Sequence, residues 1–534
     1  MPANHMVFIP VSISHLRTML QLMINLLNLH PSLIITLLSL EVYNKRLDQE
    51  FALHPKQTLD AVRDRYRVVM VPDGLDDAGN TLLENSVFLE KGRERVEGLI
   101  RGDEEGKWGK RPCAFIIDIE EATRDRRDDV IMKVWDICRA GARGMIIEIT
   151  QQMGLPKIPC LRICPTMAMG IYRFCFSDEE YGIGEKLLDR YEMYKAEGME
   201  ELRAANKAIR FIQGKLLEWP DLPPMYDYEW TSQGETITVD SNYLLFHHMI
   251  YTTFHDLDGY ICTSIPELDT MALKEIEKSL GKPVYAVGPQ FNETIWNVVE
   301  HTHPSDAQRD DNHIISFLNK AHKEQGENCA AYISFGTSFW PNNRPDLIEI
   351  IIDSLLLAEP PIPFIFATAS RGKITQKVID KVHQSGRGLI VDWAPQVQVL
   401  SHPAVGMFLT HCGCTSLTET IVCGVPILAL PFAADQPALS AHFTHINPIG
   451  IQLTQLLTGL VGRTTGLGEY VEGTEEAMRT QLADAWTRMR GEEGDKYRMK
   501  ISELKELMRT GGGNERHDTI LMIVMIYADV FNWV

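Results

Sequence analysis

The chain has 534 residues, of which 45% are hydrophobic and 23% charged, so it is too long for one ordinary core and has the composition of a soluble globular protein with two or more domains. Its net charge of −20 would repel phosphate backbones and anionic lipid headgroups, which argues against nucleic acid and membrane surfaces as partners. Ten cysteines at irregular spacings, without a CxxC pair, argue against a disulfide framework or a zinc ribbon and favour reduced thiols in the cytoplasm.

Neither end of the chain predicts a targeting or membrane segment. The N-terminus lacks a basic region and a small-residue cleavage site. The apolar tail 520–534 is shorter than the roughly 20 residues that a membrane span requires, and it contains Asp529. We therefore expect a cytoplasmic protein without a transmembrane segment.

Short apolar runs alternate with amphipathic stretches of helical length throughout the chain. In the first half, strands are predicted at 5–11, at "SLIITLLSL", at 113–119 and at 259–265, with a helix at 15–29. In the second half, strands are predicted at 330–336, 363–368, 387–393, 405–411 and 425–431. This alternation is typical of the α/β class, in which helices cover parallel sheets.

A polar stretch divides the two halves. After a predicted strand that ends at Gly288-Pro289, the chain becomes polar up to residue 312, which indicates a linker between domains. Near the C-terminus, residues 491–508 place apolar side chains on one helical stripe, which predicts a packed helix.

One segment departs from this pattern. Residues 120–144 carry a dense run of charges directly after a predicted buried strand, where a short loop into an apolar helix would be usual. The segment is either a solvated helical insertion or an artefact of the gene model, and its composition is compatible with both.

Ligands of open parallel sheets bind beyond the carboxyl ends of the strands, so polar residues at those positions are the candidates for chemistry. Four places qualify: His15, Asp118, the turn 334–337, and the stretch "THCGCTSLTE" at 410–419. They fall in both halves of the chain, which suggests a ligand in a cleft between two domains.

The stretch 410–419 has three possible interpretations. A metal site is disfavoured because no second pair of ligands lies nearby at zinc spacing. A phosphate site requires small residues and free backbone amides at a strand-to-helix turn. The pattern Ser416-x-x-Glu419 is also that of a capping box, which would satisfy helix donors without any ligand. The local sequence leaves capping and ligand binding equally open.

The wider frame of residues 393–436 closely resembles the donor-binding signature of family-one UDP-sugar glycosyltransferases of the plant secondary-product type. The matching residues are Trp393, Pro395, Gln396, His402, His411, Cys412, Gly413, Ser416, Glu419, Gly424, Val425, Pro426, Pro431, Asp435 and Gln436. The resemblance extends to "YISFGT" and to the segment before the linker. It implies the GT-B fold, in which two Rossmann-like domains with parallel sheets face each other across a cleft.

On this resemblance, 1–290 is an acceptor-binding domain, 291–312 a linker, 313–505 a domain that binds the UDP-sugar, and 506–534 a helix that packs back on the first domain. Trp393 would stack on the uracil, with Ala394 and Gln396 beside it, and Glu419 would accept hydrogen bonds from the ribose. His411, Gly413, Thr415 and Ser416 would hold the diphosphate, which Gly336 and Thr337 would approach from the other side. Asp435 and Gln436 would contact the sugar.

The resemblance also implies a catalytic pair in the first domain. His15 would remove the proton of the acceptor hydroxyl, Asp118 would orient His15, and the sugar would be transferred with inversion. No metal and no other cofactor would be needed, and a monomer is expected. Cys414 and Thr415 replace a tryptophan and an asparagine that are usual in the signature, which points to an altered choice of donor.

The acceptor expected from the resemblance is a small lipophilic compound with a hydroxyl group, such as a terpenoid, a sterol or a phenolic, and the donor is UDP-glucose, UDP-xylose or another UDP-sugar. Apolar stripes at 165–176 and 243–254 could line its pocket, although such stripes more often form core. A UDP-sugar-binding protein without catalysis is the alternative, since segment 120–144 could displace Asp118 from His15. A nicotinamide oxidoreductase is disfavoured because no GxGxxG follows the first strand.

Overall fold

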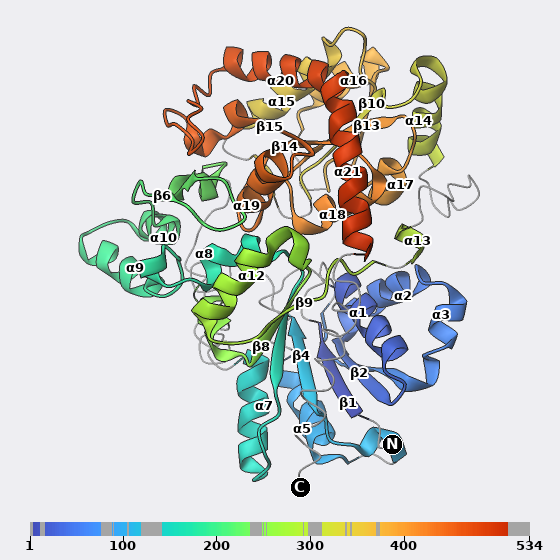
Figure 1. Ribbon diagram of the computed structural model, residues 1–534, viewed down its shortest axis with the longest axis vertical. Coiled ribbons are helices and arrows are strands. Elements are labelled where there is room, and N and C mark those ends of the chain that lie inside the picture. Colours follow the sequence, from blue (N-terminus) through green and yellow to red (C-terminus); the bar gives the residue numbers. More distant parts are fainter. Residues whose placement is uncertain are drawn as a thin grey trace.

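The computed structural model describes residues 4–10, 16–75, 88, 90–103, 106–118, 141–234, 248, 250–252, 254–291, 293–296, 312–336, 339–341, 344–369 and 374–510. His15, Thr337, the charged segment up to residue 140, most of 243–254 and residues 511–534 lie outside the described residues. The described chain forms two lobes, each built on one parallel sheet (Figure 1).

The first lobe contains a seven-stranded parallel sheet of order β3-β2-β1-β4-β5-β8-β9. Its strands are β1 (Asn4–Ile9), β2 (Leu33–Leu40), β3 (Tyr66–Val71), β4 (Ala114–Asp118), β5 (Cys160–Cys164), β8 (Gly259–Cys262) and β9 (Val284–Ala286). Its helices are α1 (Leu16–Leu29), α2 (Asn44–Ala52), α3 (Lys56–Asp60), α5 (Arg93–Arg101), α7 (Gly141–Gln152), α8 (Tyr172–Cys175), α9 (Leu187–Ala196), α10 (Glu201–Arg210), α12 (Pro266–Leu280) and α13 (Glu293–Trp296). A short antiparallel pair, β6 (Leu216–Leu217) with β7 (Met225–Tyr226), follows α10.

The second lobe contains a six-stranded parallel sheet of order β12-β11-β10-β13-β14-β15. Its strands are β10 (Ala330–Ser334), β11 (Phe364–Ala367), β12 (Gly388–Val391), β13 (Val405–Thr410), β14 (Ile427–Ala429) and β15 (Gly450–Gln452). Its helices are α14 (Asn312–Gln325), α15 (Asp346–Leu356), α16 (Gln376–Ser385), α17 (Gln396–Leu400), α18 (Cys414–Cys423), α19 (Gln436–Ala441), α20 (Glu475–Met489) and α21 (Glu492–Thr510).

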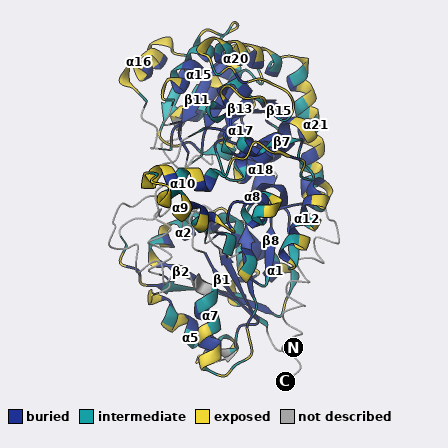
Figure 2. Ribbon diagram, turned by 90° about the vertical axis from the view of Figure 1, so that its left-hand side faces the viewer, coloured by how far each residue is buried: buried dark blue, intermediate teal, exposed yellow. Residues whose placement is uncertain are grey.

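The predicted α/β class with parallel sheets is confirmed. Strands that are covered by helices on both faces lack the alternation of apolar and polar residues, and β2, β10 and β13 are buried along their whole length. Figure 2 shows these buried strands at the centre of each lobe, with the exposed residues on the surrounding helices. The sequence had not indicated β3, β5 and β15. Two of these, β3 and β15, lie at sheet edges, and β15 has only three residues.

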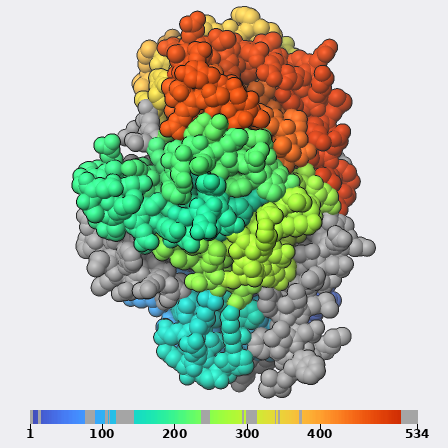
Figure 3. Space-filling model, turned by 60° about the vertical axis from the view of Figure 1, so that its left-hand side comes forward, coloured from blue at the N-terminus to red at the C-terminus, as the bar shows by residue number. Residues whose placement is uncertain are grey.

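A continuous apolar core joins the two lobes. One cluster of buried side chains contains Met169 and Tyr172 of the first lobe together with Leu417 and Phe443 of the second. The stripe 165–176 therefore belongs to the core, as most such stripes do. Figure 3 shows the part of the first lobe that carries α9 and α10 lying against the second lobe.

Helix α21 contributes to this shared core. Its residues Ile501, Leu504 and Met508 are buried, as the helical stripe predicted. The helix descends the second lobe and its end reaches the level of the first (Figure 1). The four-part division at residues 290, 312 and 505 stays a prediction. Within the described part of the chain, no helix is both long and apolar enough to cross a membrane.

Gly459 provides a test of how closely the lobes must approach. This glycine belongs to the second lobe and donates its backbone N–H to Ser232 of the first at 3.0 Å. A Cβ atom at Gly459 would lie 2.1 Å from the Thr231 carbonyl oxygen. We expect Gly459→Ala to lower the free energy of unfolding by about 1–3 kcal/mol, the usual cost of overpacking, as measured by denaturant unfolding.

Gly491→Ala is the matched control, because its nearest neighbouring atom would be 3.6 Å from the new Cβ. Equal stability of the two variants would show that the contact between the lobes is not close-packed at Gly459.

Candidate active site

The candidate residues of the second lobe gather where its strands end. Strands β10 and β13 are neighbours in the sheet, and Ser334 pairs with Thr410 at their carboxyl ends. The loops that follow these strands carry Gly336 and His411, and helix α18 begins directly after the second loop. The resulting edge faces α1 and α2 of the first lobe (Figure 1), so side chains from both lobes surround it.

Helix α18 begins at Cys414, and its N-cap residue is Gly413, which has no side chain to satisfy the first backbone amides. Ser416 is the third residue of the helix and is not an N-cap. The capping-box interpretation of Ser416 and Glu419 is therefore wrong, because the helix starts three residues earlier than that interpretation required. The amides at this end remain available to an anion, which the helix dipole also favours.

Glu419, Gln396 and Ser416 form one hydrogen-bonded group. The amide nitrogen of Gln396 donates to Glu419 Oε2 at 2.7 Å and to Ser416 Oγ at 3.1 Å. The amide oxygen of Gln396 accepts from the hydroxyl of Tyr332 at 3.3 Å. Glu419 lies in the second turn of α18, not in the first, and its side chain is buried. A buried carboxylate held by an amide is suited to accept hydrogen bonds from hydroxyl groups.

His411 is buried between two turns of backbone. A Cβ atom at Gly336 would lie 2.6 Å from His411 Nε2, and one at Gly413 would lie 2.7 Å from the same atom. Both positions therefore require glycine, and Gly336 additionally has a left-handed φ of +69°. Burial lowers the pKa of His411 to about 4, so its imidazole is neutral at physiological pH. The neutral imidazole has one N–H, which can donate either to the backbone of Ser334 or to an anion at the end of α18.

Trp393 and Ala394 follow strand β12. Trp393 is 55% exposed, so it does not belong to the core. Its indole presents a plane on which an aromatic ring could stack. Ala394 is buried and packs with Val399 and Leu400 of α17, which positions Gln396 at the start of that helix.

Asp435 and Gln436 lie at the beginning of α19. Thr166 of the first lobe donates its hydroxyl to Asp435 Oδ2 at 2.7 Å, and Gln436 Oε1 accepts from the backbone amide of Phe432 at 2.9 Å. Both side chains therefore already have partners within the protein. A ligand that uses Asp435 has to share it with Thr166.

Cys412 and Cys414, the two cysteines of the stretch for which a metal site was considered, are buried thiols. Burial raises the pKa of Cys414 to about 12 and raises that of Cys412 further still, so neither is a thiolate near neutral pH. In the described ranges, no group of three His, Cys, Asp or Glu side chains is arranged to hold a metal ion.

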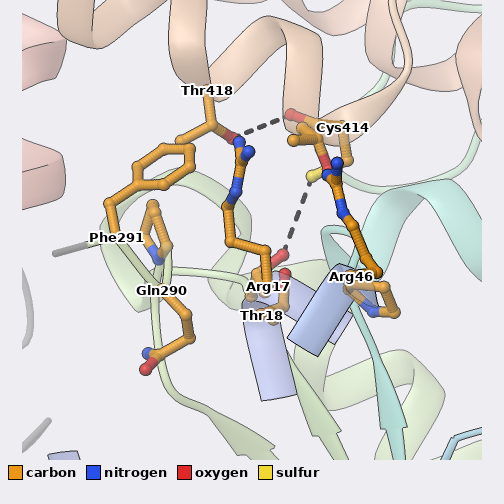
Figure 4. A pocket seen from close by; sticks show the side chains of 11 residues that line it. Arg17, Thr18, Arg46, Gln290, Phe291, Cys414 and Thr418 are labelled. Carbon is orange, nitrogen blue, oxygen red and sulfur yellow. Dashed lines mark hydrogen bonds between the residues drawn. The ribbon is translucent and has the colours of Figure 1, made fainter. Parts of the chain in front are cut away.

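A small cavity lies between the lobes beside α18. Its volume is about 140 Å³, less than the roughly 300 Å³ at which ligand clefts begin, so it forms only part of a site. Its lining comprises Arg17, Thr18, Arg46, Pro165, Thr263, Pro289, Gln290, Phe291, Cys414, Thr415 and Thr418 (Figure 4). Thr415 is exposed at the start of the helix, whereas Cys414 contacts Thr263 of the first lobe.

The side chains of three predicted site residues are not among those that the structure describes. His15 and Thr337 lie outside the described residues, and only the backbone of Asp118 is described, as the last residue of β4. Strands β1 and β4 are parallel neighbours in the first sheet, so they end at the same edge. The described structure leaves a His15–Asp118 contact as a prediction.

Sequence reasoning did not identify Arg17. Its guanidinium contacts Glu419 of the second lobe at 2.9 Å and Glu50 of α2 at 2.9 Å. The only signal in the sequence was a charged residue within the apolar stripe of the first predicted helix, two residues after His15.

Known proteins resemble this chain in sequence and in fold. Residues 298–456 match the family model described as UDP-glucoronosyl and UDP-glucosyl transferase. UDP-glycosyltransferase eriJ of Hericium erinaceus is 27% identical over 295 residues, covering 52% of this chain and 56% of that protein. UDP-glycosyltransferase 76E4 of Arabidopsis thaliana is 30% identical over 257 residues, covering 46% and 50%.

Over this part of its sequence, the chain is similar to UDP-glycosyltransferases. The alignments span little more than half the length of these curated relatives. A UGT transferase of Siraitia grosvenorii, solved in complex with UDP, aligns with a TM-score of 0.62 at 17% identity over 98% of this chain and 100% of that one. Medicago truncatula UGT71G1, complexed with UDP-glucose, aligns with a TM-score of 0.60 at 19% identity over 99% and 98%. The fold is GT-B.

The contact between Gly336 and His411 can be tested by substitution. Gly336→Ala places a Cβ in contact with the imidazole, in addition to the strain of a left-handed residue. We expect the free energy of unfolding to fall by about 1–2 kcal/mol for the backbone and about 1–3 kcal/mol more for the clash.

Gly386→Ala is the matched control, since Gly386 has a φ of +63° and no atom within 4 Å of a new Cβ. Denaturant unfolding of both variants separates the two costs. Equal losses would contradict a close approach of His411.

The burial of His411 also predicts a dependence of stability on pH. Its folded pKa of about 4 lies below the ordinary value of 6.5, so the unfolded chain takes up a proton first as the pH falls. Stability is therefore fully present above about pH 6.5 and falls towards pH 4, by up to about 1.4 kcal/mol per pH unit. We expect His411→Asn to reduce this slope in urea unfolding at pH 7 and pH 5. An unchanged slope would show that other groups, such as His402, account for it.

Proposed function

We propose that the chain is an enzyme that transfers a sugar from a UDP-sugar to a hydroxyl group of a small lipophilic acceptor, with inversion. One observation carries the proposal. The buried Glu419, held by Gln396, lies on the helix whose uncapped N-terminus faces His411 and Gly336. Acceptors for ribose hydroxyls and donors for a diphosphate are thus side by side in one loop-and-helix unit.

The donor would lie along this unit. The exposed Trp393 supports stacking on the uracil, and Glu419 with Gln396 supports hydrogen bonds to the ribose. His411, Ser416 and the backbone amides from Gly413 to Thr415 would hold the diphosphate, with Gly336 and Thr337 on its other side. Asp435 and Gln436 would meet the sugar.

The chemical step requires a base for the acceptor. His15 would take the proton of the acceptor hydroxyl, Asp118 would orient the imidazole, and the acceptor oxygen would form the new bond at the anomeric carbon. The bond from that carbon to the β-phosphate oxygen would break in line, and its electron pair would leave with UDP. Attack opposite the leaving group inverts the configuration.

Charge that develops on UDP in this step has to be stabilised. The N-terminus of α18 and the imidazole of His411 would stabilise it, and such preorganised donors are a large part of catalysis. The proposal therefore includes no metal and no cofactor other than the donor substrate. We further propose a monomer acting in the cytoplasm.

The most detailed part of the proposal concerns which UDP-sugar and which class of acceptor the enzyme uses. Cys414 and Thr415 place smaller side chains at the start of α18 than the family signature has, which favours a donor preference other than the commonest one. UDP-glucose, UDP-xylose or another UDP-sugar would serve. Terpenoids, sterols and phenolics of specialised metabolism are the acceptor classes that the resemblance to the family signature supports.

A UDP-sugar-binding protein without catalysis is the alternative. It is favoured by the charged segment 120–144, which follows Asp118 directly in the sequence. In the glycosyltransferase, His15 acts as the base for the acceptor hydroxyl, whereas in the binding protein it takes part in no reaction.

Substitution of His15 tests the proposal. The wild-type chain should release UDP from UDP-glucose or UDP-xylose in the presence of hydroxylated terpenoids, sterols or phenolics, with the glycoside detected by mass spectrometry. We expect His15→Ala to reduce the turnover by at least about a hundredfold, the usual contribution of general-base catalysis, while UDP binding measured by calorimetry is retained.

Lys320→Ala is a control on the second lobe, since Lys320 is exposed and lies on α14. UDP binding without turnover in the wild-type chain would favour the binding protein, and absence of UDP binding would contradict both functions.

A further inference from the structure

The side chain of Arg17 joins the two lobes at the donor site. Arg17 is the second residue of α1, and its Nη1 lies 2.9 Å from Glu419 Oε1 across the cleft. Its Nε lies 2.9 Å from Glu50 Oε2 within the first lobe. Figure 4 shows Arg17 and Arg46 both directed towards helix α18. One guanidinium therefore connects a carboxylate of the first lobe with the carboxylate proposed to bind ribose.

The contact between Arg17 and Glu419 belongs to a row of alternating charges. Arg46 contacts Glu50 at 2.6 Å, so two arginines and two glutamates form a chain from Arg46 through Glu50 and Arg17 to Glu419. The side chains of Glu50 and Glu419 are only 3% and 5% exposed. Buried carboxylates need a partner to stay charged, and Glu419 has no other cation among the described ion pairs.

The protonation of both partners follows from their surroundings. Burial raises the pKa of Glu419, and Arg17 acts against that rise. Burial also works against the charge of Arg17, yet Glu419 and Glu50 raise the net pKa of its guanidinium above the ordinary value. Without Arg17, the buried carboxyl of Glu419 would shift towards its neutral form, which is a poorer acceptor for hydroxyl donors.

The carboxylate of Glu419 has hydrogen-bonding capacity beyond its contacts with Arg17 and Gln396. Arg17 engages Oε1 and Gln396 engages Oε2, one donor to each oxygen. An ionised carboxylate offers about four lone-pair positions, so two remain for hydroxyl groups. The two protein donors fix the plane of the carboxylate and thereby the direction of the positions that remain.

We propose that Arg17 is a positioning residue for the donor site, which holds Glu419 ionised and oriented from the opposite lobe so that it accepts the ribose hydroxyls of a UDP-sugar. This inference rests on the proposed function. It also makes the donor site dependent on the first lobe, because the cation that completes it comes from the helix that directly follows His15. The donor half is thus complete only when the lobes face each other.

Substitution of Arg17 tests the inference by calorimetry with UDP. We expect Arg17→Met to weaken UDP binding about tenfold, since removing one partner of a buried pair leaves the other uncompensated. The KM for the UDP-sugar should rise by a similar factor, whereas kcat should stay within about threefold, which is the signature of lost binding rather than lost chemistry. Arg17→Lys keeps one cation and should restore part of the affinity.

Arg93→Met is the matched control. Arg93 likewise joins two carboxylates from two helices, Glu97 of α5 and Glu148 of α7, but all three lie in the first lobe. Its substitution should leave the affinity for UDP unchanged.

A double-mutant cycle distinguishes positioning of Glu419 from a general effect on the lobes. Glu419→Gln removes the charge that Arg17 balances, so adding Arg17→Met to it should cause little further loss of UDP affinity. Additive losses would overturn the inference, as would an Arg17→Met variant that binds UDP like the wild-type chain.

The two proposals fail in distinguishable ways. Absence of UDP binding in the wild-type chain would overturn the proposed function and this inference with it. Unchanged binding in Arg17→Met would overturn the inference alone. If Arg17→Met does not fold, Arg17→Lys carries the test: UDP affinity equal to that of the wild-type chain would then overturn the inference, and weaker binding with unaltered thermal unfolding would support it.

Discussion

The continuous apolar core between the lobes is the constraint on which the rest of the structure depends. Parallel sheets concentrate their loops at the carboxyl ends of the strands, and here the second lobe turns that edge towards the first. Tyr172 and Met169 pack in the same cluster as Leu417 of α18, so the helix that carries Glu419 is anchored from both sides. Because the core fixes the two lobes against each other, polar side chains of one lobe lie within hydrogen-bonding distance of polar side chains of the other.

Local features of the second lobe form the candidate donor site. Glycines at 336 and 413 leave space for a buried imidazole, and the glycine N-cap leaves the first amides of α18 unsatisfied. Gln396, at the start of α17, holds Glu419 of α18 by a hydrogen bond. The neighbouring residues therefore provide the space and the hydrogen-bonding groups on which these side chains depend.

The first lobe contributes a cation and two hydroxyl groups to contacts with the candidate donor site. Arg17 contacts Glu419, Thr166 contacts Asp435, and Thr263 contacts Cys414. Three of the candidate donor-site positions are therefore touched by the opposite lobe. This explains why the described cavity is small and lies at the boundary, and why substitutions in α1 are expected to affect a site on α18.

The sequence by itself determined the α/β class and most strands of both sheets, because apolar runs and turn residues are local signals. The donor-binding interpretation of residues 393–436 came from their resemblance to the family signature. In the structure, Gly424 ends α18 with a left-handed φ of 81°, a conformation that glycine adopts readily. The tertiary structure alone decided that Ser416 is not a cap, that Trp393 is exposed, and that Arg17 pairs with Glu419. Those outcomes depend on where a helix begins and on contacts between residues about 400 positions apart, which no local pattern encodes.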